Sequence, residues 1–131
     1  MLIDTTLLID FLRGKREAIT FLEEKEKQQQ LYTTEINVFE LVMGVYAKKQ
    51  EPQIETEKIC ALLSRFIVLP LERRGVIKAG EIAGGLIKSG NRIEETDCLI
   101  AGIALANGIT EIITANKEHY ERIKELKVIS Y

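Results

Sequence analysis

Short apolar runs alternate with longer amphipathic segments along the whole chain. The short runs are rich in Ile, Leu, Val and Thr, which is typical of strands buried in a sheet. They predict four to five strands, at residues 1–4, 31–34, 66–71, 111–114 and 128–131. The longer segments carry apolar residues at helical spacing. They predict helices over residues 7–12, 15–27, 36–46, 54–63, 72–88 and 97–106, with a short charged helix around Tyr120 and Ile123.

Breaks fall between these elements. Gly14, Pro52, the Ser89-Gly90-Asn91 turn and Asn107-Gly108 end helices, and Thr96 is the expected N-cap of the helix that begins at Asp97. Strands that alternate with helices predict right-handed crossovers and a parallel sheet covered on both faces. The expected fold class is therefore α/β in three layers, with 66–71 as a buried strand and 128–131 as an edge strand.

Composition and charge narrow the class of protein. A chain of 131 residues with 46% hydrophobic and 29% charged residues suits one globular domain, residues 1–131. The net charge of −2 gives no general attraction for nucleic acid, so any RNA contact must be local. Cys60 and Cys98 lie in apolar helical runs without disulfide or metal spacing, and we expect core residues of a cytoplasmic protein. No secretory signal and no membrane span is expected.

Acidic residues follow or open several of the predicted elements. Asp4 ends the first strand, Asp97 begins a helix, and Glu40 lies in the apolar stripe of the helix over 36–46. Taken singly, each has an ordinary explanation: Asp4 and Asp97 suit helix starts, and Glu40 suits the solvent edge of its stripe. Thr114 and Asn116 end another strand. Because ligands of parallel sheets bind beyond the carboxyl ends of the strands, all five side chains are candidates for one crevice.

Three carboxylates in one crevice would repel one another and would need a divalent cation. Oxygen ligands suit Mg²⁺ or Mn²⁺, which retain water and accept phosphate oxygens as further ligands. Such an ion activates water for in-line attack on phosphorus and stabilises the developing charge. The three acids therefore predict a metal-dependent nuclease.

Four segments also resemble those of the PIN domain, and most closely the VapC toxin subunits of VapBC toxin-antitoxin pairs. These segments are 2–10, 33–41 with Gly44, 97–101 with Ala104, and 114–120. The resemblance implies a three-layer α/β/α PIN-like fold and a Mg²⁺- or Mn²⁺-dependent endoribonuclease. It also implies an RNA substrate, a cognate antitoxin whose C-terminal segment covers the crevice, and a homodimer. Leu8, Phe11, Leu12 and Phe21 are candidate contacts of the antitoxin.

The same resemblance assigns roles to individual residues. Asp4, Glu40 and Asp97 match the acidic metal-binding triad of the family. Thr5 or Thr6 matches a hydroxyl that supports the first aspartate, and Thr114 and Asn116 match the polar strand end.

The chain departs from the family at a fourth acidic position. His119 stands there, just before an aromatic residue, which puts a second metal in doubt. We expect His119 to be a solvated surface residue, with a side chain that points into the crevice as the alternative. Either Glu94 or Glu95 could supply a missing carboxylate, but both are expected to be solvated loop charges. The basic residues that could line an RNA path are Arg13, Lys15, Arg16, Lys48, Lys49, Arg73, Arg74 and Arg92.

Other interpretations compete with a nuclease. An aspartyl-phosphate phosphatase needs a second Asp two positions after the first, and Thr6 stands there. A response-regulator receiver needs an Asp closing the third strand, and the run 68–71 has none. A catalytically silent scaffold or partner subunit is the remaining alternative, and the intact triad argues against it.

Overall fold

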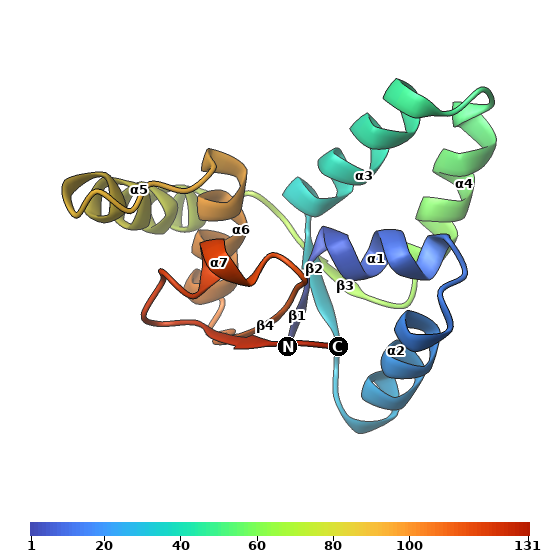
Figure 1. Cartoon of the computed structure of the whole chain (residues 1–131), viewed down its shortest axis with the longest axis horizontal. Helices are drawn as coiled ribbons and strands as arrows, with labels where there is room; N and C mark the ends of the chain where they lie inside the picture. Colours follow the sequence, from blue (N-terminus) through green and yellow to red (C-terminus); the bar gives the residue numbers. More distant parts are fainter.

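The computed structural model describes residues 1–131, with a five-stranded parallel sheet at its centre (Figure 1). The strands are β1 (Leu2–Ile3), β2 (Tyr32–Thr34), β3 (Ile67–Leu69), β4 (Glu111–Ile113) and β5 (Lys127–Ile129), in the order β3-β2-β1-β4-β5. The helices are α1 (Thr5–Leu12), α2 (Arg16–Gln28), α3 (Glu35–Lys48), α4 (Pro52–Leu63), α5 (Arg73–Lys88), α6 (Glu95–Ala106) and α7 (Lys117–Tyr120). The predicted α/β class with a parallel sheet is confirmed.

The two faces of the sheet bury two separate apolar cores. Successive side chains of a strand point to opposite faces, so Leu2 and Ile112 join the core beneath α5, α6 and α7. Ile3 and Ile113 join the core beneath α1 to α4. Figure 1 shows the two groups of helices on either side of the sheet. These are the three predicted layers.

The sheet edges differ from the prediction on one side. β5 is an edge strand as expected, but β3, expected to be buried, forms the opposite edge. Ile67 in β3 is 45% exposed. The reason is topological, because β1 and β4 take the centre and β3 pairs only with β2. A continuous apolar run does not by itself distinguish a central strand from an edge strand.

Several local sequence signals predict the structure correctly, and two do not. Gly14 and Gly108 follow helix ends at φ 75° and 74°, a left-handed conformation that favours glycine. Thr96, by contrast, lies inside α6, which begins at Glu95 after an N-cap at Glu94. Cys98 is buried as expected, whereas Cys60 is exposed, because the core-facing side of α4 is formed by Ile59 and Leu62.

The α5–α6 contact is close enough to require glycine. A Cβ built on Gly102 would lie 2.5 Å from the Ala79 nitrogen and 2.6 Å from the Gly75 oxygen, both main-chain atoms. The two helix backbones therefore touch at this point. Their packing fixes α6, and with it the position of Asp97 at the start of that helix.

The strand order reverses at β1. From β1 the chain moves through β2 to β3 on one side, and then returns through α5 and α6 to β4 on the other side. The crevice beyond the carboxyl ends of β1 and β4 is the place where parallel sheets bind ligands. Asp4 immediately follows β1 at this crevice, and Thr114 immediately follows β4.

Candidate active site

Asp4 is held by three uncharged side chains. Asn37 Nδ2 donates to its Oδ1 at 3.1 Å, Thr114 Oγ1 donates to its Oδ2 at 2.6 Å, and the Tyr120 hydroxyl donates to Oδ1 at 3.4 Å. The carboxylate makes no helix-capping hydrogen bond at the start of α1. Its orientation therefore comes from β4, α3 and α7, and capping does not explain it.

Burial raises the pKa of Asp4 above its ordinary value. The residue is only 4% exposed, and the negative charge of Asp97 raises the pKa further, while the Thr114 hydroxyl lowers it in part. No lysine or arginine forms an ion pair with Asp4. The carboxylate is thus held in one orientation without an ion pair that would neutralise its charge.

Asp97 lies in the first turn of α6, is 6% exposed, and shares the Tyr120 hydroxyl with Asp4. This hydroxyl donates to Asp97 Oδ1 at 3.1 Å. The other oxygen, Oδ2, is hydrogen-bonded to His119 Nδ1 at 2.5 Å and accepts from Asn116 Nδ2 at 3.4 Å. Burial and the neighbouring carboxylates raise the pKa of Tyr120, so its phenol stays protonated and remains a donor.

Glu40 is linked to the same network through Thr5. The Thr5 hydroxyl donates to Glu40 Oε1 at 2.8 Å and accepts from Asn37 Nδ2 at 2.9 Å. Partial burial, followed by the negative charges of Asp4 and Asp97, raises the pKa of Glu40 to about 6, despite the opposing Thr5 hydrogen bond. The three acids of the predicted triad therefore interact electrostatically, although they come from distant parts of the sequence.

The supporting hydroxyls act differently from the expectation. Neither hydroxyl is hydrogen-bonded to the Asp4 carboxylate: the Thr5 hydroxyl supports Glu40, and Thr6 Oγ1 accepts from the Ala115 amide at 3.0 Å. Thr114 is the hydroxyl that holds Asp4. Thr6 thus ties α1 to the segment after β4.

Two residues of the network were missed by sequence reasoning. Asn37 is fully buried and forms a capping box with Thr34 at the start of α3. The Thr34-x-x-Asn37 spacing was a usable signal for the helix start, though not for the contact with Asp4. Tyr120 looked like an ordinary apolar residue of a short helix, and only the fold reveals its shared hydroxyl.

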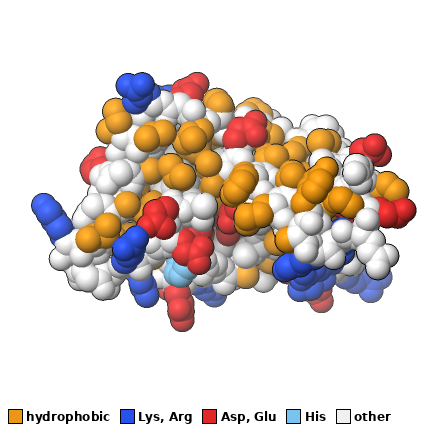
Figure 2. Space-filling model, turned by 90° about the horizontal axis from the view of Figure 1, so that it is seen from above, with side chains coloured by type: hydrophobic (Ala, Val, Ile, Leu, Met, Phe, Trp, Pro, Cys, Tyr) orange, Lys and Arg blue, Asp and Glu red, His pale blue; other side chains and the backbone are white.

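The histidine expected in solvent also belongs to this network. The His119 side chain is 28% exposed, and its contact with Asp97 makes the expectation of a fully solvated residue wrong. Glu95 is exposed and pairs with Arg92. Glu94 is exposed as well, yet its charge contributes to the raised pKa of Glu40. Figure 2, which views the molecule from above, shows hydrophobic side chains (orange) spread over this face with several acidic side chains (red) among them.

The donor set suits a hard divalent cation in part. Asp4 and Asp97 provide carboxylate oxygens without a basic counter-ion other than His119. No three carboxylate, imidazole or thiolate side chains are close enough together to hold an ion by themselves. Two buried aspartates and a less buried glutamate would leave several coordination positions to water, as Mg²⁺ prefers.

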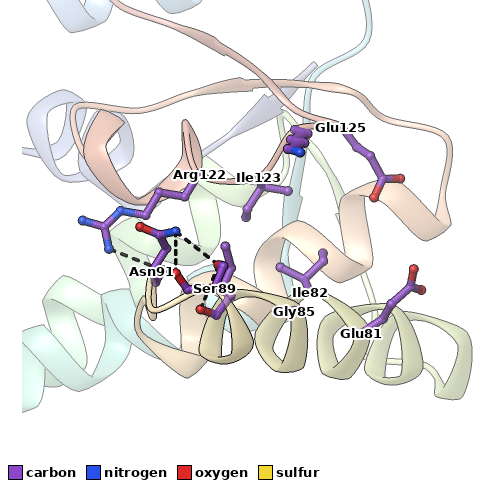
Figure 3. A pocket seen from close by; sticks show the side chains of 10 residues that line it. Glu81, Ile82, Gly85, Ser89, Asn91, Arg122, Ile123 and Glu125 are labelled. Carbon is purple, nitrogen blue, oxygen red and sulfur yellow. Dashed lines mark hydrogen bonds between the residues drawn. The ribbon is translucent and has the colours of Figure 1, made fainter.

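A hollow on another side of the molecule is separate from these acids. It has a volume of ≈ 570 Å³ and lies between α5 and the segment from Arg122 to Glu125 (Figure 3). Arg122 donates to the main-chain oxygens of Asn91 and Arg92, and Glu125 accepts from Lys78. Arg122 thus ties its segment to the loop after α5, Glu125 ties it to α5 itself, and none of the triad lines this hollow.

The family model for the PIN domain matches residues 1–126. The chain belongs to the PIN domain family. The PIN domain of this chain is 28% identical to "Ribonuclease VapC1" of Methanocaldococcus jannaschii over all of this chain and 86% of that protein. It is 25% identical to the "tRNA(fMet)-specific endonuclease VapC" of Shigella flexneri, covering 96% of this chain and 93% of that protein.

A solved structure shows the same PIN fold. DNA-bound VapBC from Salmonella typhimurium has a chain with a TM-score of 0.86 and 25% identity, covering 98% of this chain and 96% of that one. The similarity extends over both helical layers and the sheet. The expected PIN-like architecture is thereby confirmed.

Proposed function

We propose that this protein is a Mg²⁺- or Mn²⁺-dependent endoribonuclease whose metal is held by Asp4 and Asp97, with Glu40 as the third ligand either directly or through a water. The observation that carries the proposal is the shared Tyr120 hydroxyl, which joins two buried carboxylates that lack lysine or arginine partners. Like charges in a buried crevice are unfavourable unless a cation or protons compensate them. The names of the VapC relatives support RNA as the substrate.

The chain's own residues would hold and orient the ion. Asp4 and Asp97 would provide oxygen ligands, and Glu40, tethered by Thr5, would provide another or hold a water. When bound, the cation supplies Lewis acidity that activates water and stabilises charge on the phosphoryl oxygens. Asn37, Thr114 and Tyr120 keep the carboxylates in place without competing with the ion for their negative charge.

We also propose that the protein is the toxin of a toxin-antitoxin pair and binds a cognate antitoxin. The similarity to VapBC structures supports this partner. Among the apolar residues considered as contacts of the antitoxin, Leu8 is fully buried and therefore excluded. The Phe11 ring is covered by Arg65, whose guanidinium carbon lies 5.0 Å from the ring centroid. Leu12 and Phe21 are partly buried and remain candidates.

A homodimer in the cytoplasm completes the proposal. The outer face of α3 exposes Phe39, Met43 and Tyr46 to solvent by 53–56%, and such a patch suits a subunit interface. Cys60 is exposed and unpaired, as in proteins of a reducing compartment. No helix of the structure is both long and apolar enough to cross a membrane.

The test of the enzyme is Asp97→Asn, compared with Glu95→Gln as a matched control from the same helical turn. Both variants lose one negative charge, but Glu95 is exposed and pairs with Arg92. Labelled RNA is incubated with each purified protein and Mn²⁺, Mg²⁺ or EDTA. We expect Asp97→Asn to cut more than about 100-fold slower, since losing even an outer partner of a metal ligand reduces activity 10–100-fold. Undiminished cleavage by Asp97→Asn would refute the site.

A further inference from the structure

A small apolar pocket lies between α1, α3 and α4, which meet on the right in Figure 1. Its volume is ≈ 180 Å³, below the range of about 300–1,000 Å³ that holds drug-sized ligands. Ile9, Leu12, Leu41, Val45 and Ile59 form its apolar wall. The pocket therefore fits one small flat or branched group and excludes a larger ligand.

Three basic side chains line the pocket without partners. Arg13, Lys48 and Lys49 are exposed, and none forms an ion pair or a side-chain hydrogen bond. They are thus free to bind an external anion, and they come together from the C-terminal ends of α1 and α3 in a chain of net charge −2.

Three of the other basic residues first considered for an RNA path are engaged elsewhere, and the remaining two, Arg16 and Arg73, do not line the pocket. Lys15 pairs with Asp10, Arg92 pairs with Glu95, and Arg74 donates to the Ala106 main-chain oxygen at the end of α6. A local concentration of free positive charge is what a nucleic acid requires when the whole molecule is acidic.

The pocket adjoins the catalytic crevice through Glu40. This residue lines the pocket and accepts the Thr5 hydrogen bond that links it to Asp4. A nucleotide in the pocket would therefore belong to the strand whose phosphodiester lies at the acids. Glu55, also in the lining, is paired with Lys58, so the three free cations outnumber the carboxylates of the lining.

Gly44 creates part of the hollow. A Cβ at this position would meet no atom within 4 Å, and the backbone is helical. Close packing does not demand a glycine here, unlike at Gly102. A larger side chain at position 44 would extend into the pocket without disturbing the helix.

We propose that this pocket binds one unpaired nucleotide of the RNA substrate, with its base against the aliphatic wall and adjacent phosphates on Arg13, Lys48 and Lys49. The inference rests on the proposed ribonuclease function and adds a recognition site to it. Single-strand binding combines a basic groove for the backbone with side chains against which bases stack, and in this pocket aliphatic side chains take the place of the usual aromatic ones. A protein segment would fill the wall equally well, but its affinity would not require three unpaired cations.

The first test measures binding of a fluorescein-labelled 12-nucleotide single-stranded RNA by anisotropy in EDTA, so that cleavage does not contribute. Gly44→Leu fills the pocket, and Gly84→Leu is the matched control because Gly84 in α5 is exposed and equally open. We expect Gly44→Leu to bind roughly five-fold or more weakly, the loss of one base contact, and Gly84→Leu to bind like the wild type. RNA made abasic throughout should remove the difference between Gly44→Leu and the wild type.

The second test measures the salt dependence of the same binding. Each lost phosphate contact on a single strand lowers the slope of log K against log salt by about 0.7. The double variant Lys48→Gln/Lys49→Gln should lower it by about 1.4. Lys88→Gln/Lys124→Gln removes the same charge from exposed positions away from the pocket and should leave the slope unchanged.

The outcomes separate the pocket from the enzyme. If the wild type cuts RNA while Gly44→Leu binds RNA as tightly as the wild type, the pocket inference is wrong and the proposed function stands. If Gly44→Leu binds RNA like the wild type but no longer co-purifies with a co-expressed antitoxin, the pocket binds a protein partner and the inference is overturned. If RNA is never cut but Gly44→Leu weakens its binding, the pocket inference stands and the proposed function fails.

Discussion

Replacing Glu40 with Gln should stabilise the metal-free protein, because the charge of Glu40 is held in an unfavourable place. Partial burial and two neighbouring aspartates raise the pKa of Glu40 from 4.5 to about 6. The folded state therefore binds the proton more tightly than the unfolded state does. The contribution of Glu40 to stability is therefore highest below pH 4.5 and falls as the pH rises through about 6, where the folded protein also loses this proton.

The magnitude follows from the size of this rise. One pKa unit corresponds to about 1.4 kcal/mol, which gives about 2 kcal/mol as the upper bound for the ionised Glu40 at pH 7. The side chain is only partly buried, and solvent screening reduces the figure to about 1 kcal/mol. Gln has an amide oxygen in place of the carboxylate oxygen that accepts from Thr5. The substitution therefore removes the charge and retains the hydrogen bond.

The assay is urea unfolding of both proteins in EDTA at pH 4 and pH 7. Glu40→Gln should be about 1 kcal/mol more stable than the wild type at pH 7 and equal to it at pH 4. Millimolar Mn²⁺ should reverse the order at pH 7, because the ion stabilises the wild type by binding its folded state. A Glu40→Gln protein less stable than the wild type in EDTA at pH 7 would contradict the raised pKa and the repulsion behind it.

Four further substitutions probe the network, the helix packing and the α3 surface. Tyr120→Phe should lower the free energy of unfolding by about 1–2 kcal/mol and slow RNA cleavage roughly 10–100-fold, measured by denaturation and initial rates; an unchanged rate would remove Tyr120 from the site. Gly102→Ala should lower the free energy of unfolding by about 1–3 kcal/mol because the α5 and α6 backbones must separate. Gly44→Ala should raise it by up to about 1 kcal/mol. Equal shifts of the melting temperature in the two variants would contradict the close packing at Gly102. Met43→Glu should dissociate the proposed homodimer in light scattering, and an unaltered mass of a dimer would place the interface elsewhere.

The fold was predictable where the signal was local. Alternating short and long apolar segments gave the parallel sheet and its helical layers, and Gly14 and Gly108 gave helix ends. The position of β3 was not predictable from its own residues, because an edge strand and a central strand can carry the same apolar run. Strand order depends on contacts between distant segments, and Ile67 contains no information about them.

The candidate site divides in the same way. Asp4, Glu40 and Asp97 stand out because acids are unusual next to buried elements. The family resemblance then assigns all three to one metal-binding triad. Asn37 and Tyr120 do not stand out, since an amide in a capping box and an aromatic in a short helix are common in any protein. Their roles arise only when β1, α3 and α7 meet.

The identity of those partners explains how an acidic site can exist before any ion is bound. Every fully buried side-chain polar atom has a hydrogen-bond partner, and the donors to Asp4 are an amide and two hydroxyls. A lysine in their place would stabilise the carboxylate more, but it would also neutralise the charge that attracts a cation. Neutral donors fix the position of the oxygens and leave their charge available. The burial and repulsion of charge at Glu40 and Asp4 lower the stability of the metal-free protein. Binding of a divalent ion would therefore relieve this unfavourable electrostatic free energy.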